Sequence, residues 1–163
     1  QFSFTAAEHP ALHPGQSAMI SRNGEQVGWV GQLHPKLQAQ LDFSTPVYLF
    51  QIDVAKVSES RLPKFSEVSK FPAVRRDLAF LMDSQIASAD LMSEARIAAG
   101  EHLVDLMLFD VYQSKDIDNK GKSLALGLTF QHASRTLNDN EINMSIDRVV
   151  KKLDIKFKAE LRG

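Results

Sequence analysis

The order of secondary-structure patterns after Phe71 constrains the fold of this chain more than any other feature. Pro72 disfavours continuation of a preceding helix. An apolar run follows in which Leu78, Phe80 and Met82 share one face of a strand. The later patterns predict, in order, a helix, two strands, a second helix and a last strand. Their expected bounds are about 75–82, 88–99, 103–112, 122–131, 138–153 and 156–162.

Both predicted helices carry end signals. Ser88 is the expected N-cap of the first, and Gly100 is its expected stop. In the second, Asn138 at the N-cap and Glu141 three residues later form a capping-box-like pair. Helical spacing gives this helix a buried stripe of Ile142, Ile146, Val149, Val150 and Leu153. Two βαβ units in this order predict an α+β fold, a ferredoxin-like βαββαβ sandwich.

Residues 1–54 predict a separate piece of antiparallel sheet. The dipeptide Asn23-Gly24 separates two apolar stretches and is a strong hairpin signal. A short helix is expected from Pro35, followed by a strand over 47–53. These elements are too few to cover both faces of a sheet, so the rest of this module is expected before Gln1.

Two stretches of the first seventy residues lack a regular pattern. Residues 1–16 predict a loop. His9 and His13 have the spacing of a helical metal site, but Pro14 disfavours a helix there, and no metal site is predicted. Residues 55–70 lose periodicity and gain serine and charge, which indicates a linker. The expected organisation is therefore a module piece at 1–54, a linker at 55–70 and a domain at 71–163.

Composition excludes several classes of function. The chain has no cysteine, which rules out disulfides and thiolate chemistry. No apolar run approaches the length of a membrane span, so no membrane partner is expected. The start at Gln1 without Met indicates a fragment. Because the formal net charge is −1, nucleic-acid binding has to come from local pattern, such as the five basic residues from Lys151 onwards.

Alternation assigns side chains to the two faces of the predicted sheet. The third strand directs leucines and Phe130 to the core, and its other face carries only small side chains, which are Ser123, Ala125, Gly127 and Thr129. The same reasoning places around this row Arg75 and Asp77, Asp110 and Tyr112, and, from the last strand, Lys156, Lys158 and Arg162.

Such a face suits single-stranded RNA. Arg75 and Tyr112 offer stacking surfaces, the aspartates accept hydrogen bonds from base amines, and the basic residues hold phosphates. The charged loop over 115–122 is a further candidate for tRNA contact. The alternatives are a face that packs against protein or binds a small regulatory ligand, an Arg76–Asp77 surface ion pair, and a solvated lysine edge. A small enzyme is a further alternative, but Asp83-Ser84-Gln85 lacks the glycine-rich phosphate loop that it needs.

Three short motifs carry a resemblance to a known family. They are Phe71-Pro72-Ala73-Val74-Arg75-Arg76-Asp77, Phe109-Asp110-Val111-Tyr112, and the ending Ala159-Glu160-Leu161-Arg162-Gly163. In this order they resemble the ferredoxin-fold anticodon-binding domain at the C-terminus of the bacterial phenylalanyl-tRNA synthetase beta subunit. Residues 1–54 are similar to the end of the class II synthetase-like module that precedes it.

The resemblance implies the wider function. The expected role is binding of the tRNA(Phe) anticodon stem-loop, in a fragment that is itself non-catalytic and holds no cofactor. In the parent ligase a partner alpha subunit is expected to activate phenylalanine with ATP and Mg²⁺, within a cytoplasmic α2β2 heterotetramer.

Overall fold

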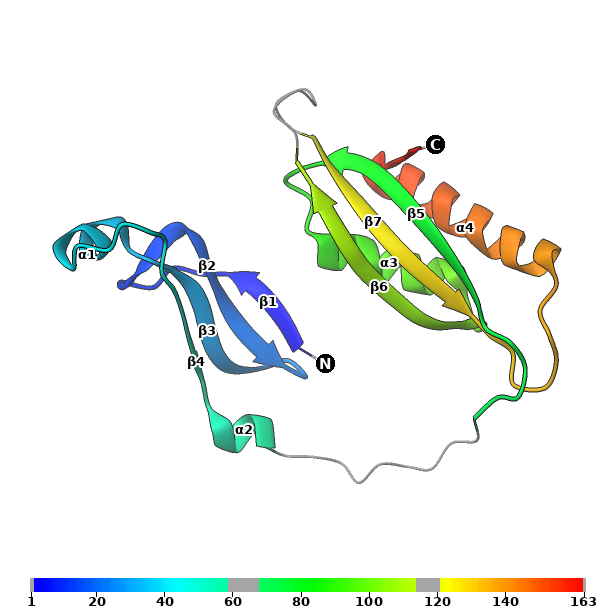
Figure 1. Cartoon of the computed structure of the whole chain (residues 1–163), viewed down its shortest axis with the longest axis horizontal. Helices are drawn as coiled ribbons and strands as arrows, with labels where there is room; N and C mark the ends of the chain where they lie inside the picture. The colour runs from blue at the N-terminus through cyan, green and yellow to red at the C-terminus, as the bar shows by residue number, and fades with distance from the viewer. Residues whose placement is uncertain (1, 59–67, 114–120, 163) are drawn as a thin grey trace. The chain divides into compact units, whose positions relative to one another are not determined.

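Two compact units, Gln1–Phe65 and Ser66–Gly163, make up the chain. The computed structural model describes residues 2–58, 68–113 and 121–162. Figure 1 traces both units, and each is treated by itself below.

The second unit has the predicted order of strands and helices. Its elements are β5 (Val74–Asp83), α3 (Ser88–Ala99), β6 (Leu103–Tyr112), β7 (Gly121–Phe130), α4 (Asp139–Phe157) and β8 (Glu160–Arg162). The strands lie in the order β6-β7-β5-β8, and every neighbouring pair is antiparallel. This arrangement confirms the α+β class and the βαββαβ topology.

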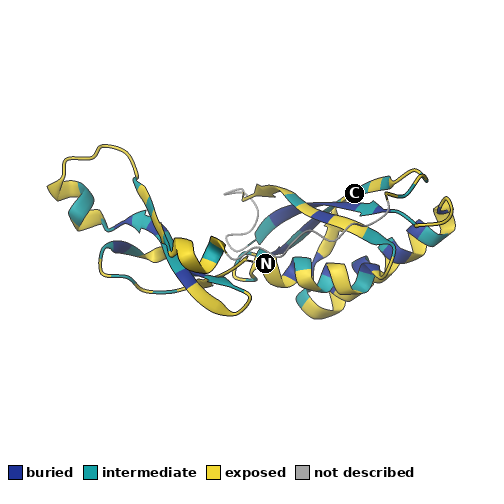
Figure 2. Ribbon diagram, turned by 90° about the horizontal axis from the view of Figure 1, so that it is seen from below, coloured by how far each residue is buried: buried dark blue, intermediate teal, exposed yellow. Residues whose placement is uncertain are grey.

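Both helices of the second unit cover the same face of its sheet, as Figure 2 shows from below. The core lies between them and the sheet. On β7, Leu124, Leu126 and Leu128 are fully buried. They pack in one cluster with Leu91 of α3 and Val149 of α4. Full burial of such a side chain is worth about 1.5–3 kcal/mol, so this row fixes which face of the sheet is the core.

The two ends of α3 agree with the prediction at one end only. The helix stops at Gly100, where φ is 83°. Its N-cap, however, is Ala87 rather than Ser88, and no side chain caps the helix there. The prediction was wrong because it placed the serine just outside the helix, whereas Ser88 is the first helical residue.

The start of α4 confirms the predicted capping box. The Asn138 side chain accepts a hydrogen bond from the Glu141 backbone N–H at 2.9 Å, and the Glu141 carboxylate accepts one from the Asn138 N–H at 3.0 Å. The Arg135 guanidinium also donates to this carboxylate. The Arg135 hydrogen bond first, and the Asn138 N–H second, lower the pKa of Glu141 to about 2.

The predicted last strand was wrong over its first half. α4 continues to Phe157, Lys158 closes it as a left-handed C-cap with φ of 54°, and β8 covers only Glu160–Arg162. The sequence fits both periods here, because Phe157 lies four residues after Leu153 and also alternates with Ala159. Packing of Phe157 against the helical core decides for the helix.

The first unit is a sheet in the order β1-β2-β3-β4, with all pairs antiparallel. Its elements are β1 (Phe2–Ala6), β2 (Leu12–Arg22), β3 (Glu25–Leu33), α1 (Pro35–Gln40), β4 (Tyr48–Ile52) and α2 (Val54–Ser58). The hairpin at Asn23-Gly24 is confirmed, with φ of 52° and 87° at the two turn residues.

The loop predicted over residues 1–16 was wrong in part. Residues 2–6 form β1, which pairs along β2 with Phe4 opposite Ile20. Nearby, the ring of His9 stacks on Trp29 with centroids 4.5 Å apart. In the described ranges 2–58, 68–113 and 121–162, no group of three metal-ligating side chains occurs.

One face of the first sheet is rich in exposed apolar side chains. Cross-strand register places Phe4 beside Ile20 on this face, and Phe50 beside Val30. Phe50 is 71% exposed and Tyr48, on the same face, is 65% exposed. An apolar face of this kind needs a covering layer in a stable domain.

The segment between the units is described only at its ends. The predicted linker at 55–70 begins within α2, residues 59–67 lie outside the described residues, and Ser69 donates a hydrogen bond to the His132 carbonyl. Among the helices that the structure describes, none is long and apolar enough to cross a membrane.

Removal of the α4 cap is expected to destabilise the second unit. Asn138→Ala leaves the Glu141 N–H without its acceptor, and the expected loss is about 1 kcal/mol of unfolding free energy. Urea unfolding of the chain measures it. Asn140→Ala, an exposed change two residues later, is the matched control. Equal losses in both variants would contradict the capping role.

The Glu141 carboxylate makes stability depend on pH. Its pKa is lowered in the folded chain, so its stabilising effect is present above the ordinary value of 4.5 and is lost as pH falls towards about 2. Wild type is therefore expected to exceed Glu141→Gln in unfolding free energy at neutral pH, with a gap that closes between these two values. Urea midpoints across this range measure the gap, and a gap independent of pH would refute the assignment.

Candidate nucleic-acid interface

The face of the second sheet opposite the helices is the candidate site, and we call it the open face. Register defines its members, because residues paired across neighbouring strands point to the same side. Arg75 lies opposite Thr129, Asp77 opposite Gly127, and Ala79 opposite Ala125. On β6, Met107 lies opposite Gly127, Asp110 opposite Ala125 and Tyr112 opposite Ser123.

Arg75 crosses the open face from β5 to β6. Its Nε donates to Asp77 Oδ1 at 2.8 Å. Its Cζ lies 5.5 Å from the centroid of the Phe109 ring, within cation–π range. The guanidinium passes over Gly127 of β7, the strand between these two. The Arg75 side chain is 49% exposed, so the group remains open to a ligand.

Phe109 is the functional candidate that the sequence reasoning missed. Alternation from Asp110 and Tyr112, which the sequence reasoning placed on the open face, puts Phe109 on the core side. The pairing of β6 with β7 shifts register, however, between Leu108 on the core side and Asp110 on the open face. This bulge allows Phe109 and Asp110 to lie on the same face, and the Phe109 ring contacts Arg75 there. The side chain is 47% exposed. The register of β6 carries no signal of the bulge in the sequence, so alternation was bound to miss it.

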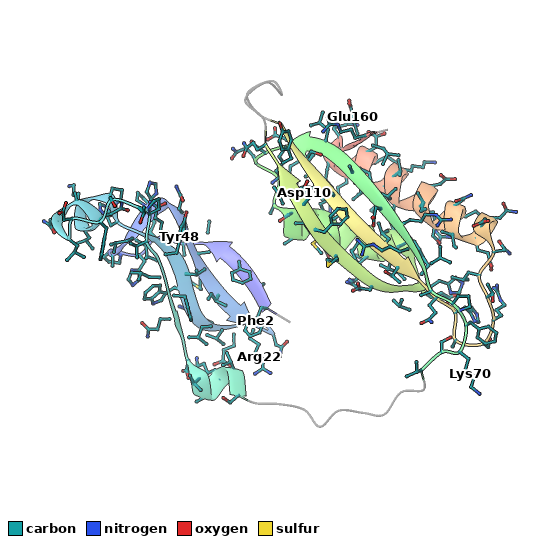
Figure 3. The ribbon with its side chains drawn as sticks, viewed as in Figure 1. Phe2, Arg22, Tyr48, Lys70, Asp110 and Glu160 are labelled. Atoms are coloured by element: carbon teal, nitrogen blue, oxygen red, sulfur yellow. The ribbon has the colours of Figure 1, made fainter. Side chains whose placement is uncertain are left out.

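Asp110 and Tyr112 occupy the end of β6 as predicted. Both are exposed, Tyr112 to 52%. Figure 3 shows the side chains around Asp110 on this strand. The structure thus places a carboxylate and a phenol on the same face as the Arg75 guanidinium.

The row of small side chains on β7 is less open than expected. Ala125 and Thr129 are half-buried, while Ser123 and Gly127 are buried. Gly127 is buried because the Arg75 guanidinium covers it. The row of small side chains therefore lies beneath larger side chains from β5 and β6 and does not expose backbone directly to solvent.

The two arginines of the domain-opening motif serve different partners. The surface ion pair of Arg76 with Asp77, one of the alternatives to RNA binding, does not form. Arg76 Nη2 instead lies 3.3 Å from Asp139 Oδ1 on α4, and Asp77 pairs with Arg75. Neighbouring residues on a strand point to opposite faces, so Arg76 is directed to the helix side.

The three predicted cations of the last strand separate in the structure. Arg162 lies opposite Ala79 and so belongs to the open face. Lys158 is the C-cap of α4 and does not lie on a strand. Lys156 lies within α4, where its Nζ contacts Glu94 Oε1 of α3 at 2.6 Å. The assignment of Lys156 to the open face was therefore wrong, because the helix continues through it.

The loop expected to contact RNA at 115–122 is described only from Gly121 onwards. Lys122 donates hydrogen bonds to the carbonyl groups of Ser84 and Ile86 in the turn before α3. It lies opposite Met82, on the core side of β5. Residues 115–120 lie outside the part of the chain that the structure describes.

The Glu94–Lys156 contact can be tested by titration. Lys156 first, through its hydrogen bond, lowers the pKa of Glu94, and Lys152 adds a weaker effect. Lys156→Gln is expected to raise the pKa of Glu94 measured by NMR, and by more than the control Lys152→Gln does. An unchanged Glu94 pKa in Lys156→Gln would contradict the placement of Lys156 on α4.

Family models match nearly the whole chain. Residues 69–162 match a model described as a ferredoxin-fold anticodon binding domain. Residues 1–54 match a model described as a phenylalanyl tRNA synthetase beta chain CLM domain.

Individual proteins are similar over the same length. Phenylalanine–tRNA ligase beta subunits from Pseudomonas savastanoi and Pseudomonas putida are each 51% identical to this chain, over 162 and 161 residues. The beta subunit from Nitrosococcus oceani is 47% identical over 161 residues. Each alignment covers 99% of this chain and 20% of the relative, so the chain spans about a fifth of the length of these curated relatives. The chain belongs to the ferredoxin-fold anticodon binding domain family, in the form found in phenylalanine–tRNA ligase beta subunits.

Proposed function

We propose that the open face binds the anticodon stem-loop of tRNA(Phe). The observation that carries this proposal is the half-exposed Arg75 guanidinium beside the exposed Phe109 ring, on a sheet face that neither α3 nor α4 covers. Unpaired bases stack on aromatic rings and guanidinium planes, and their edges form hydrogen bonds with nearby polar groups. Asp77, Asp110 and Tyr112 supply such groups on the same face.

The open face carries few basic side chains. Arg75 and Arg162 are its basic side chains among the described residues of the sheet, while Lys156 is held by Glu94 on the helix side. Lys158 at the end of α4 is exposed and adds charge near β8. Few phosphates can be neutralised by so small a set, so stacking and base-edge hydrogen bonds should supply much of the affinity.

The domain organisation is part of the proposal. Residues 1–54 are taken as the end of a catalytic-like module, 55–70 as a linker and 71–163 as the anticodon-binding domain. The two family matches support this division. The exposed apolar face around Phe50 supports the view that residues 1–54 are only part of their module.

In the longer protein, the fragment would act without chemistry of its own. The proposed partner is an alpha subunit that activates phenylalanine with ATP and Mg²⁺, in an α2β2 enzyme of the cytoplasm. The role of the open face is then to select and orient the tRNA, so that its acceptor end reaches the alpha subunit.

Loss of a stacking side chain is expected to weaken RNA binding without unfolding the chain. Arg75→Ala and Tyr112→Ala should each reduce affinity for the tRNA(Phe) anticodon stem-loop by about tenfold, as stacking contacts typically do. Both side chains are about half exposed, so thermal stability should hardly change. Fluorescence anisotropy with a labelled stem-loop gives the affinities.

The controls separate RNA reading from other uses of this face. Arg96→Ala removes an exposed arginine from α3 and should leave affinity unchanged. A loop-scrambled RNA should bind more weakly than the native loop, at about 50 mM and about 200 mM salt. Equal binding of both RNAs would favour the alternative, a face for protein contacts or a small regulatory ligand.

A further inference from the structure

Gly127 lies under the Arg75 guanidinium at the centre of the open face. A Cβ at this position would be 2.8 Å from Arg75 Nη2 and 3.1 Å from both Cζ and Nε. Real Cβ atoms essentially never approach closer than 3.0 Å, so a side chain here would displace the guanidinium. All three atoms belong to the guanidinium, so it is this group, and not the aliphatic part of Arg75, that lies over Gly127.

Two further contacts position the Arg75 guanidinium. Asp77 accepts from Nε at 2.8 Å and anchors the guanidinium on β5. The Phe109 ring approaches Cζ to 5.5 Å from the β6 side. The two terminal nitrogens, Nη1 and Nη2, have no acceptor among the described residues. The guanidinium is therefore positioned by the Asp77 carboxylate, the Phe109 ring and the space above Gly127. Its solvent-exposed side remains available to a ligand.

We propose that Gly127 is a positioning residue for RNA binding, because it leaves room for the Arg75 guanidinium beside Phe109, where the two form the seat of one unpaired base. This inference rests on the proposed function and deepens it. A base would stack on the guanidinium and contact the ring, while Nη1 and Nη2 donate to the base edge or to the adjoining phosphate. Stacking of this kind accepts a planar base and is lost when the plane is displaced.

The substitution Gly127→Ala is expected to affect RNA binding only by displacing the Arg75 guanidinium. Gly127 does not have a positive φ, so the backbone accepts alanine, and the atoms that must move are the far end of a flexible side chain. The variant should fold with nearly wild-type stability. We expect it to bind the anticodon stem-loop about tenfold more weakly, the effect of losing one stacked base.

A double-mutant cycle tests this dependence. The affinities of wild type, Gly127→Ala, Arg75→Ala and the double variant for the tRNA(Phe) anticodon stem-loop are measured with the 163-residue chain. The double variant is expected to bind like Arg75→Ala alone, because no guanidinium remains to be displaced. Wild-type affinity in Gly127→Ala, or losses that add in the double variant, would overturn the proposal.

Two conservative variants separate a stacking plane from a simple charge. Arg75→Lys keeps the charge and loses the plane, and it should bind as weakly as Arg75→Ala. Phe109→Leu keeps the apolar volume and loses the ring, and it should also weaken binding. If Arg75→Lys retained full affinity, the guanidinium would act only as a counter-charge for phosphate, and the base seat would be disproved.

Stem-loops that lack one base identify the occupant. The base is removed from each anticodon nucleotide in turn. At one position the loss of affinity in wild type should disappear in Gly127→Ala and Arg75→Ala. Identical losses in all three proteins would overturn the proposal.

A control variant and a reference RNA distinguish failure of the base seat from failure of the proposed function. Gly15→Ala adds a methyl group at an ordinary 3.7 Å from the His13 ring, in the other unit, and should leave binding unchanged. If wild type binds native and scrambled loops equally, the proposed function and the base seat both fail. If wild type discriminates and Gly127→Ala discriminates equally well, only the base seat fails.

Discussion

Burial of one face of β7 determines how every other surface of the second unit can be used. Leu124, Leu126 and Leu128 are fully buried beneath α3 and α4. Because side chains alternate along a strand, the intervening residues must lie on the other face, which neither α3 nor α4 covers. The sheet order then brings β5 and β6 to either side of that strand. Arg75 and Phe109 meet across it over Gly127, which has no side chain to occupy the place of the guanidinium.

Much of this fold follows from local patterns in the sequence. The capping box at Asn138 and the stop at Gly100 are short-range signals, and the start of α4 and the end of α3 formed as expected. The last strand was predicted too long because residues around Phe157 satisfy helical and strand periods equally. Only packing against the core decides between them, and that information is spread over α3 and α4 rather than held in the segment itself.

The candidate site was predictable to the extent that alternation holds. Arg75, Asp77, Asp110 and Tyr112 lie on the expected face, and Arg162 joins them through its pairing with β5. Phe109 was missed because a bulge in β6 breaks the alternation locally. The role of Gly127 could not be predicted from the sequence either. It depends on the Arg75 side chain, which extends from the neighbouring strand over this glycine.

The most direct test of the central claim is to map where the anticodon stem-loop touches this chain. Isotope-labelled protein is titrated with the RNA, and backbone amide shifts are followed by NMR. Binding by the open face predicts that the largest changes cluster at Asp77, Phe109 and Gly127, with little change at the exposed Ile97 of α3 or Ile155 of α4. Changes concentrated on the two helices, or on the first unit, would contradict the account.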